Sequence, residues 1–185
     1  MRKNFGVKSW FYPQPVLIIG TYDENGSPDA MNAAWGGLYD GNKVELCLSA
    51  GHKTTKNIRA TGAFTVSFAD AANLVASDYV GLASANTEPK KMEKSGFHLT
   101  KSQFVNAPLI DELPVAMECK LIKINEDGNV IGEIVNVSAD ESVLGEDGNI
   151  DFSKFRPISF EPVHNGYHVL GERVGNAFQD GAALK

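Results

Sequence analysis

Apolar and polar residues alternate along several separate segments of this chain, which is the pattern of β-strands that bury one face. In residues 43–50, for example, the large aliphatic residues Val44, Leu46 and Leu48 alternate with Glu45 and Cys47. After Leu121 the apolar positions shift phase to Ile122 and Ile124, which predicts a β-bulge, and Asp127-Gly128-Asn129 then supplies a hairpin turn. We expect strands at residues 15–22, 43–50, 64–68, 115–121 and 130–138, and short closing strands at 158–163 and 167–170.

Three segments carry helix start or stop signals. The expected helices are 53–61 before Gly62, 71–80 after Asp70 as N-cap, and 88–95 between Thr87 as N-cap and Gly96. Strands outnumber helices and do not alternate with them, so a parallel doubly wound sheet is not expected. The pattern favours a mainly β fold, an antiparallel barrel that is closed or partly closed, with helical insertions in its gaps. The polar residues 140–151 are expected to form an exposed loop.

The chain has 185 residues, the size of one domain, so residues 1–185 are treated as a single domain. Its net charge of −6 argues against a nucleic-acid partner, because such binding needs a surplus of Lys and Arg. The longest aliphatic run is Val16–Ile19, far below the ~20 residues of a membrane helix, so no membrane span is expected. The N-terminus lacks the apolar region of a signal peptide, which favours a cytoplasmic protein. In that reducing compartment Cys47 and Cys119 are expected to be buried thiols.

The segment from Ser49 to Ile58 combines small residues with the start of a helix. Thr54 and Thr55 stand in its first turn, next to Lys53. Free N–H groups, the positive end of the helix dipole and nearby hydroxyls together favour an anion. The alternative interpretation is that Thr54 only caps the helix. Neither a Walker loop nor a GxGxxG motif is present, so nucleotide binding by those routes is excluded.

The segment from Gly26 to Gly37 is rich in small residues and contains one large aromatic, Trp35. A strand of this kind packs little by itself, and it would suit a planar ring system lying against it. Backbone groups of Asn32 to Trp35 could then meet the polar edge of the ring. The alternative is that Trp35 is an ordinary core residue.

These segments resemble the flavoredoxin-like branch of the flavin reductase family, whose members have an FMN-binding split β-barrel. The resemblance covers residues 13–181. It rests on the order and spacing of several short motifs, none of them strong alone. They are Pro15-Val16, Gly26-x-Pro28-x-Ala30-Met31-x-Ala33-Ala34-Trp35, Thr54-Thr55-x-Asn57-Ile58, Ala63-Phe64-Thr65-Val66, Asp78-Tyr79-x-Gly81, Gly96-Phe97, Ala107-Pro108-Leu109-Ile110, Glu118-Cys119, Ile131-Gly132-Glu133-Ile134 and Tyr167-x-x-Leu170-Gly171.

The resemblance implies a homodimer with one FMN per subunit near the subunit interface. It assigns four groups of residues to the cofactor: Asn32, Ala33, Ala34 and Trp35 to the isoalloxazine, Ser49 and Ala50 to its polar edge or the ribityl chain, Thr54 and Thr55 to the phosphate, and Ser84 and Lys91 to the closing side. Asp29 departs from the family, where Asn is common, and its contact is left open. No catalytic side chain and no metal site are expected.

With FMN supplied, the expected activity is that of an oxidoreductase. Hydride from NAD(P)H would pass to flavin N5, and electrons would continue to free flavin, ferric complexes or a redox protein. One alternative is an FMN-binding electron carrier that never meets a nicotinamide. Another is a split-barrel binding or structural protein without flavin. The sequence leaves open NADH against NADPH, and permanent against exchangeable FMN.

Overall fold

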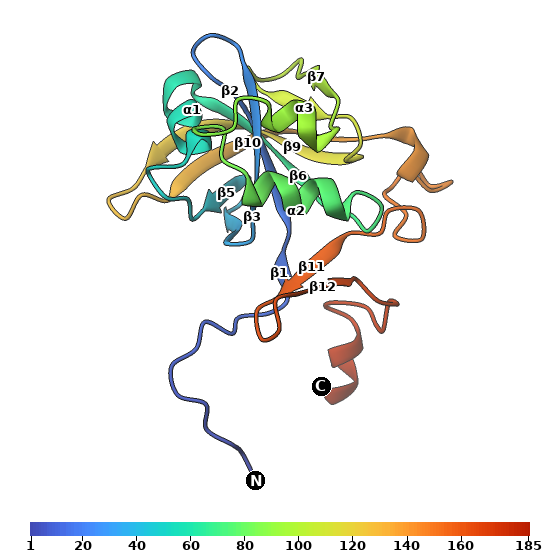
Figure 1. Ribbon diagram of the computed structural model, residues 1–185. Helices are drawn as coiled ribbons and strands as arrows, with labels where there is room; N and C mark the ends of the chain where they lie inside the picture. The colour runs from blue at the N-terminus through green and yellow to red at the C-terminus, as the bar shows by residue number, and fades with distance from the viewer.

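One curled sheet of seven strands forms the body of the protein in the computed structural model, which describes residues 1–185 (Figure 1). The strands are β2 (Leu17–Tyr22), β3 (Pro28–Ala33), β4 (Gly36–Asp40), β5 (Lys43–Leu46), β6 (Ala63–Phe68), β9 (Val115–Ile124) and β10 (Val130–Ala139). Their order across the sheet is β3-β2-β6-β9-β10-β5-β4, and every neighbouring pair is antiparallel. The expected mainly β, antiparallel architecture is confirmed.

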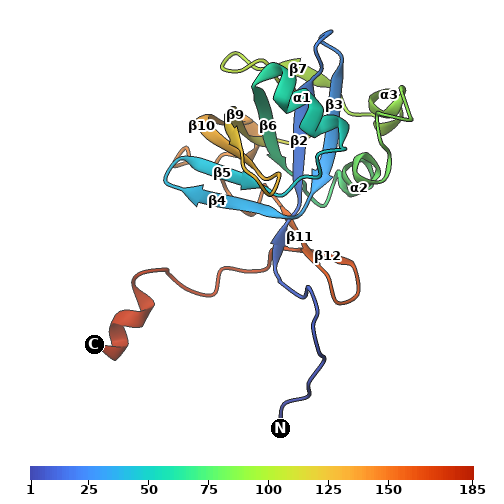
Figure 2. The ribbon, with the colours of Figure 1, turned by 90° about the vertical axis from the view of Figure 1, so that its left-hand side faces the viewer.

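The two edges of this sheet are strands that follow each other directly in the chain. β3 ends at Ala33 and β4 begins at Gly36, so only Ala34 and Trp35 connect one edge to the other. The sheet must therefore curl until its edges converge at this junction, as Figure 2 shows. Because β3 and β4 do not pair with each other, the barrel stays split along this side.

Strand β2 separates two hydrophobic cores. Leu17 and Ile19 belong to the core inside the curled sheet, where Phe64 is fully buried. Ile18 and the preceding Val16 belong to the core on the opposite face, which also contains Val80 of helix α2 (Leu74–Leu82). Burial of alternate residues on both faces explains why the longest aliphatic run of the chain lies here.

Helix α1 (Lys53–Thr61) has the bounds predicted from the sequence. It ends at Gly62, whose φ of 70° is the left-handed conformation that glycine adopts without strain. The N-cap residue, His52, makes no side-chain capping bond.

The other two expected helices begin about one turn later than predicted. Helix α2 is Leu74–Leu82, and Asp70 is not its N-cap. Asp70 Oδ1 instead accepts hydrogen bonds from the N–H and the Nδ2 of Asn73, so it stabilises the turn before the helix. Helix α3 is Lys91–Ser95, because the Thr87 hydroxyl donates back to the carbonyl of Ser84 and stabilises a turn there.

The expected closing strands do not pair with the edges of the barrel. Strands β11 (Ile158–Glu161) and β12 (Gly166–Val169) form a separate sheet with β1 (Gln14–Pro15). The single strand expected at residues 15–22 is therefore shared between two sheets and interrupted at Val16. A further small hairpin, β7 (Leu99–Lys101) with β8 (Pro108–Ile110), lacks a clear alternation and was not predicted.

The predicted bulge is confirmed in the β9–β10 hairpin. Leu121 faces Gly132 and Lys123 faces Ile131, so Ile122 has no partner across the pair. A second shift lies between Ile134 and Asn136, where the sequence shows no change of phase.

Two expectations about burial are wrong in part. Cys119 is buried, but Cys47 is exposed because it lies one residue beyond β5, on the outward side of the alternation. Burial raises the pKa of the Cys119 thiol to about 12. Within the expected exposed loop, the short 3-10 helix η1 (Glu141–Val143) buries Val143.

Both chain termini extend away from the body of the protein (Figures 1 and 2). Phe11, Val174 and Phe178 on these segments are exposed, and the C-terminal segment ends in the 3-10 helix η2 (Asp180–Leu184). None of the helices is long and apolar enough to cross a membrane.

Candidate functional site

Three pockets follow one another along β3 and the junction after it. The Lys91 pocket, lined by Asp29, Thr54, Ser84 and Lys91 among others, has a volume of about 130 Å³. The Tyr167 pocket, of about 270 Å³, shares Gly81 and Leu82 with it. The Trp35 pocket, of about 380 Å³, shares Ala34 with the Tyr167 pocket. Together they form a continuous site along the split of the barrel.

The Lys91 pocket contains a buried ion pair that joins β3 to α3. Lys91 Nζ lies 3.1 Å from Asp29 Oδ1, and the two side chains are 3% and 2% exposed. The Thr54 hydroxyl donates to Asp29 Oδ2 over 3.1 Å. Thr54 therefore does not cap its own helix. Asp29, whose contact the sequence leaves open, contacts Lys91 and Thr54 of the same chain.

The N-terminus of α1 borders the same pocket. The N–H groups of Lys53, Thr54 and Thr55 have no acceptor within the protein, since the first bond of the helix runs from Lys56 N–H to His52 O. The Thr55 hydroxyl donates to the carbonyl of Ser49 over 2.9 Å. The donors left for an anion here are thus backbone N–H groups rather than the two hydroxyls.

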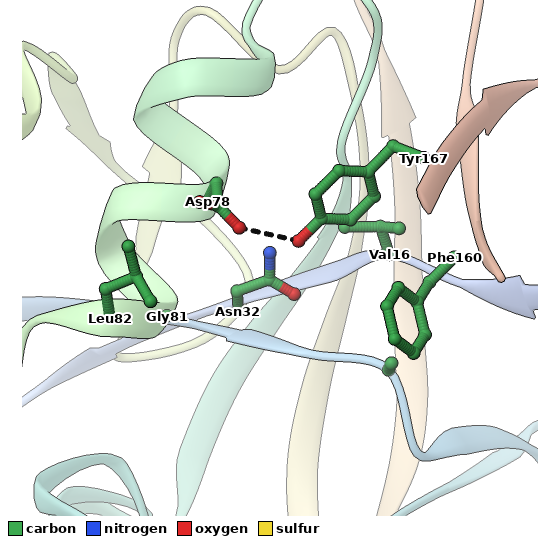
Figure 3. A pocket seen from close by; sticks show the side chains of 8 residues that line it. Val16, Asn32, Asp78, Gly81, Leu82, Phe160 and Tyr167 are labelled. Carbon is green, nitrogen blue, oxygen red and sulfur yellow. Dashed lines mark hydrogen bonds between the residues drawn. The ribbon is translucent and has the colours of Figure 1, made fainter. Parts of the chain in front are cut away.

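The Tyr167 pocket brings β3, α2 and β12 together, as Figure 3 shows. The Tyr167 hydroxyl donates to Asp78 Oδ1 over 2.7 Å. Burial, and then the neighbouring Asp78 carboxylate, raise the pKa of Tyr167 to about 12, so the phenol keeps its proton at neutral pH. On the same side of the pocket the ring of Phe160, the partner of Tyr167 on the neighbouring strand β11, lies 5.9 Å from that of Tyr167, centroid to centroid.

Close contact between α2 and β3 sets the floor of this pocket. A Cβ at Gly81 would lie 2.8 Å from the Cβ of Asn32, so only glycine allows the helix this near to the strand. Asn32 Nδ2 donates to the carbonyl of Ser77 over 3.0 Å and fixes the side chain against the helix.

Trp35 is not a core residue, because 60% of it is exposed. It lines the third pocket together with Phe11 of the N-terminal segment, Gly36 and Gly37. The Gln14 Oε1 atom is buried there without a hydrogen-bond donor. A surface of small residues beside an exposed aromatic ring is suited to a flat ligand.

The structure brings six of the ten residues proposed from the sequence into these pockets. Asn32, Ala34 and Trp35 line the two larger ones, and Thr54, Ser84 and Lys91 line the smallest. The other four line none of the three: Ala33 faces the inner core, Thr55 is buried, and Ser49 and Ala50 are exposed. Their contact with a cofactor stays a prediction.

No local signal in the sequence predicts the Tyr167–Asp78 hydrogen bond, which joins residues 89 positions apart. Alternation along β12 does predict that Tyr167 and His168 face opposite ways, and only Tyr167 lines the pocket. No group of three or more His, Cys, Asp or Glu side chains gathers as a metal site.

Comparison with known proteins identifies the family. Residues 9–159 match the flavin reductase like domain. The chain is 36% identical to the flavoredoxin of Desulfovibrio vulgaris (Miyazaki F), covering 98% of this chain and 100% of that one, with a TM-score of 0.93. It is 26% identical to the flavoredoxin of Methanosarcina acetivorans over 100% of both chains, with a TM-score of 0.89. A third similar structure, the 2-nitrobenzoate 2-nitroreductase of Pseudomonas fluorescens, is 25% identical, covers 90% of this chain and 85% of that one, and has a TM-score of 0.76. The split barrel described above is therefore that of the flavin reductase-like family, and this chain belongs to it.

Proposed function

We propose that this protein binds FMN along β3 and transfers electrons through it, as a flavoredoxin-like electron carrier. The observation that carries the proposal is the donor set of the Lys91 pocket. Lys53 and Thr54 line it, and their backbone N–H groups lack acceptors, while Lys91, paired with Asp29, lines it from α3. Free N–H groups at a helix N-terminus are groups that bind a phosphate.

The rest of the site fits the remainder of FMN. The two larger pockets continue from the Lys91 pocket along small residues, with Ala34 common to both. Small side chains let a flat ring approach the backbone, and Trp35 offers it an aromatic surface. The buried, unpaired Gln14 Oε1 supplies an acceptor at the far end.

When bound, FMN supplies one- and two-electron transfer. The chain's contribution is to position the cofactor and to control protons and water around it. Tyr167 keeps its proton on Oη, held by Asp78, and the aromatic and aliphatic walls formed by Phe160, Val16 and Leu82 limit water in the same pocket. These residues bind and orient the cofactor, and none is required as a catalytic acid or base for electron transfer.

Similarity over the whole chain supports the carrier. Both flavoredoxins align with essentially all of it, and one does so at 36% identity. The electrons would come from a separate reductase or donor protein and pass to a small-molecule or protein acceptor.

The second candidate is an NAD(P)H-dependent flavin oxidoreductase. It is favoured by the two aromatic rings of the Tyr167 pocket, against which a nicotinamide could lie beside the cofactor. The similarity to a nitroreductase is consistent with this activity.

Two measurements test the proposal and separate the candidates. Purified protein titrated with FMN should show saturable quenching of flavin fluorescence and a shifted flavin spectrum. The holoprotein is then mixed anaerobically with NADH or NADPH. A carrier keeps its colour with both, while an oxidoreductase bleaches in single turnover with at least one. Absence of any flavin binding would refute both candidates.

We also propose that two subunits assemble around the site. Trp35 is 60% exposed, and Phe11 and Leu38 beside it are 76% and 75% exposed, so the outermost pocket lacks an outer wall within one chain. Both terminal segments extend away from the body and carry exposed apolar residues that a second copy could cover. Sedimentation of the holoprotein should give the mass of two chains, and the mass of one chain would contradict the assembly.

A further inference from the structure

Both lysines that line the Lys91 pocket are already paired with a carboxylate. Lys53 Nζ lies 3.1 Å from Asp23 Oδ2, and Lys91 Nζ lies 3.1 Å from Asp29 Oδ1. The second pair is the more buried, at 3% and 2% exposure against 29% and 14% for the first. The side-chain charges around the pocket therefore cancel before any ligand enters.

The Asp29–Lys91 contact is close but is not a hydrogen bond. Asp29 Oδ1 is buried and receives no donor of suitable geometry, although the ammonium is 3.1 Å away. Asp29 is the one carboxylate within 4.0 Å of Lys91 Nζ. An ammonium has three N–H donors, so it can bind a further anion beside Asp29, and Lys91 lines the pocket where that anion would lie.

Asp29 itself also lines this pocket, so a phosphate entering it meets a buried carboxylate as well as the ammonium. In a partly desolvated site two like charges a few ångströms apart repel strongly. Attraction to Lys91 and repulsion from Asp29 are then of similar size and opposite sign. What remains for the phosphate is the neutral N–H donors of α1.

We propose that Asp29 determines how much the phosphate of FMN contributes to the free energy of flavin binding, and that it keeps this contribution small. FMN is then exchangeable, and riboflavin, which lacks the phosphate, binds almost as well as FMN. This inference rests on the proposed function, since it concerns the same cofactor site. It specifies the ligand as a flavin recognised through its ring rather than its phosphate.

The variant that tests this is Asp29→Asn. Asparagine has nearly the same shape, and its amide oxygen can stand where Asp29 Oδ2 stands and accept the hydrogen bond from Thr54. The change removes the repulsion on the phosphate and leaves the Lys91 ammonium without a counter-ion until a phosphate enters. The lost repulsion and the unpaired ammonium both strengthen the binding of FMN relative to that of riboflavin.

The measurement is the dissociation constant for FMN and for riboflavin, in wild type and variant, by fluorescence quenching. Asp29→Asn should tighten FMN by about tenfold or more and change riboflavin by less than about threefold. Glu93→Gln is the matched control, because it removes the same charge from α3 at a side chain that is 73% exposed. It should leave both constants unchanged.

Unchanged or weaker FMN binding by a folded Asp29→Asn protein would overturn the inference. Wild type alone gives a second test that needs no variant: a preference for FMN over riboflavin above about 100-fold would also overturn it, because the phosphate would then dominate binding. Either result leaves the flavin site itself intact. Failure of wild type to bind both flavins would instead refute the proposed function.

Discussion

Replacing Lys91 with methionine should destabilise this protein far more than a surface lysine change does. The ammonium is 3% exposed and is the only cation within 4.0 Å of Asp29. Lys91→Met keeps most of the length of the side chain but leaves the Asp29 carboxylate buried, with the hydroxyl of Thr54 as its remaining partner.

Breaking one side of a buried ion pair costs about 3–5 kcal/mol, because an uncompensated charge stays in the protein. In a domain of this size each kcal/mol lowers Tm by about 2–4 °C, so we expect a loss of about 6–20 °C. The double variant Asp29→Asn with Lys91→Met removes both charges and should recover most of that loss.

Thermal and urea unfolding of wild type, Lys91→Met, Asp29→Asn and the double variant, all without flavin, measure the effect and the coupling. Lys90→Met is the control, since its ammonium is 70% exposed and lies 3.9 Å from Glu93. Such a pair contributes about 0–1 kcal/mol. Two outcomes would contradict a buried, coupled Asp29–Lys91 ion pair. One is that Lys91→Met loses no more stability than Lys90→Met, and the other is that the double variant is as unstable as Lys91→Met.

Two further predictions follow from single contacts. Gly132→Ala should lower the free energy of unfolding, measured in urea, by about 1–3 kcal/mol, because the new Cβ would lie 2.8 Å from Cε1 of the fully buried Phe64. Gly37→Ala is the control, because a Cβ at Gly37 meets open space. Tyr167 should titrate late in an ultraviolet titration of the phenols, near pH 12, and Tyr167→Phe should remove that late component. Since folding raises this pKa above the ordinary value of 10.0, the stability it contributes is complete below pH 10 and is lost as pH rises through 12. Identical titration curves for the two proteins would contradict the assignment.

Local signals in the sequence predicted the fold well where one residue determines the outcome. Gly62 ends α1 because a left-handed residue is needed there, and the phase shift after Leu121 marks the bulge at Ile122. Asp70 was misread because an aspartate can cap a turn as well as a helix, and both uses give the same local sequence. Strand pairing was not predictable: nothing in residues 158–169 shows that they join β1 rather than the barrel.

The candidate site was predicted in part for the same reason. Small residues in β3 and the hydroxyls of α1 are local features, and both elements border pockets of the candidate site. The contacts that define its chemistry join distant residues. Asp29 meets Lys91 of α3, and Tyr167 of β12 meets Asp78 of α2. Such pairs depend on how α2 and α3 pack over the edge strand β3, and no short sequence motif predicts that packing.

The opening between β3 and β4 and the proposed flavin site are one feature of the topology. A strand at a sheet edge presents backbone groups that lack partners, and α2 packs against β3 without supplying a matching ladder of hydrogen bonds. Hydrogen bonds between β3 and β4 would pair those backbone groups and close the barrel, but they would also remove the space between the two strands. The two residues at the junction thus keep the edge strands near each other without pairing them, so the topology itself leaves room for the proposed flavin site.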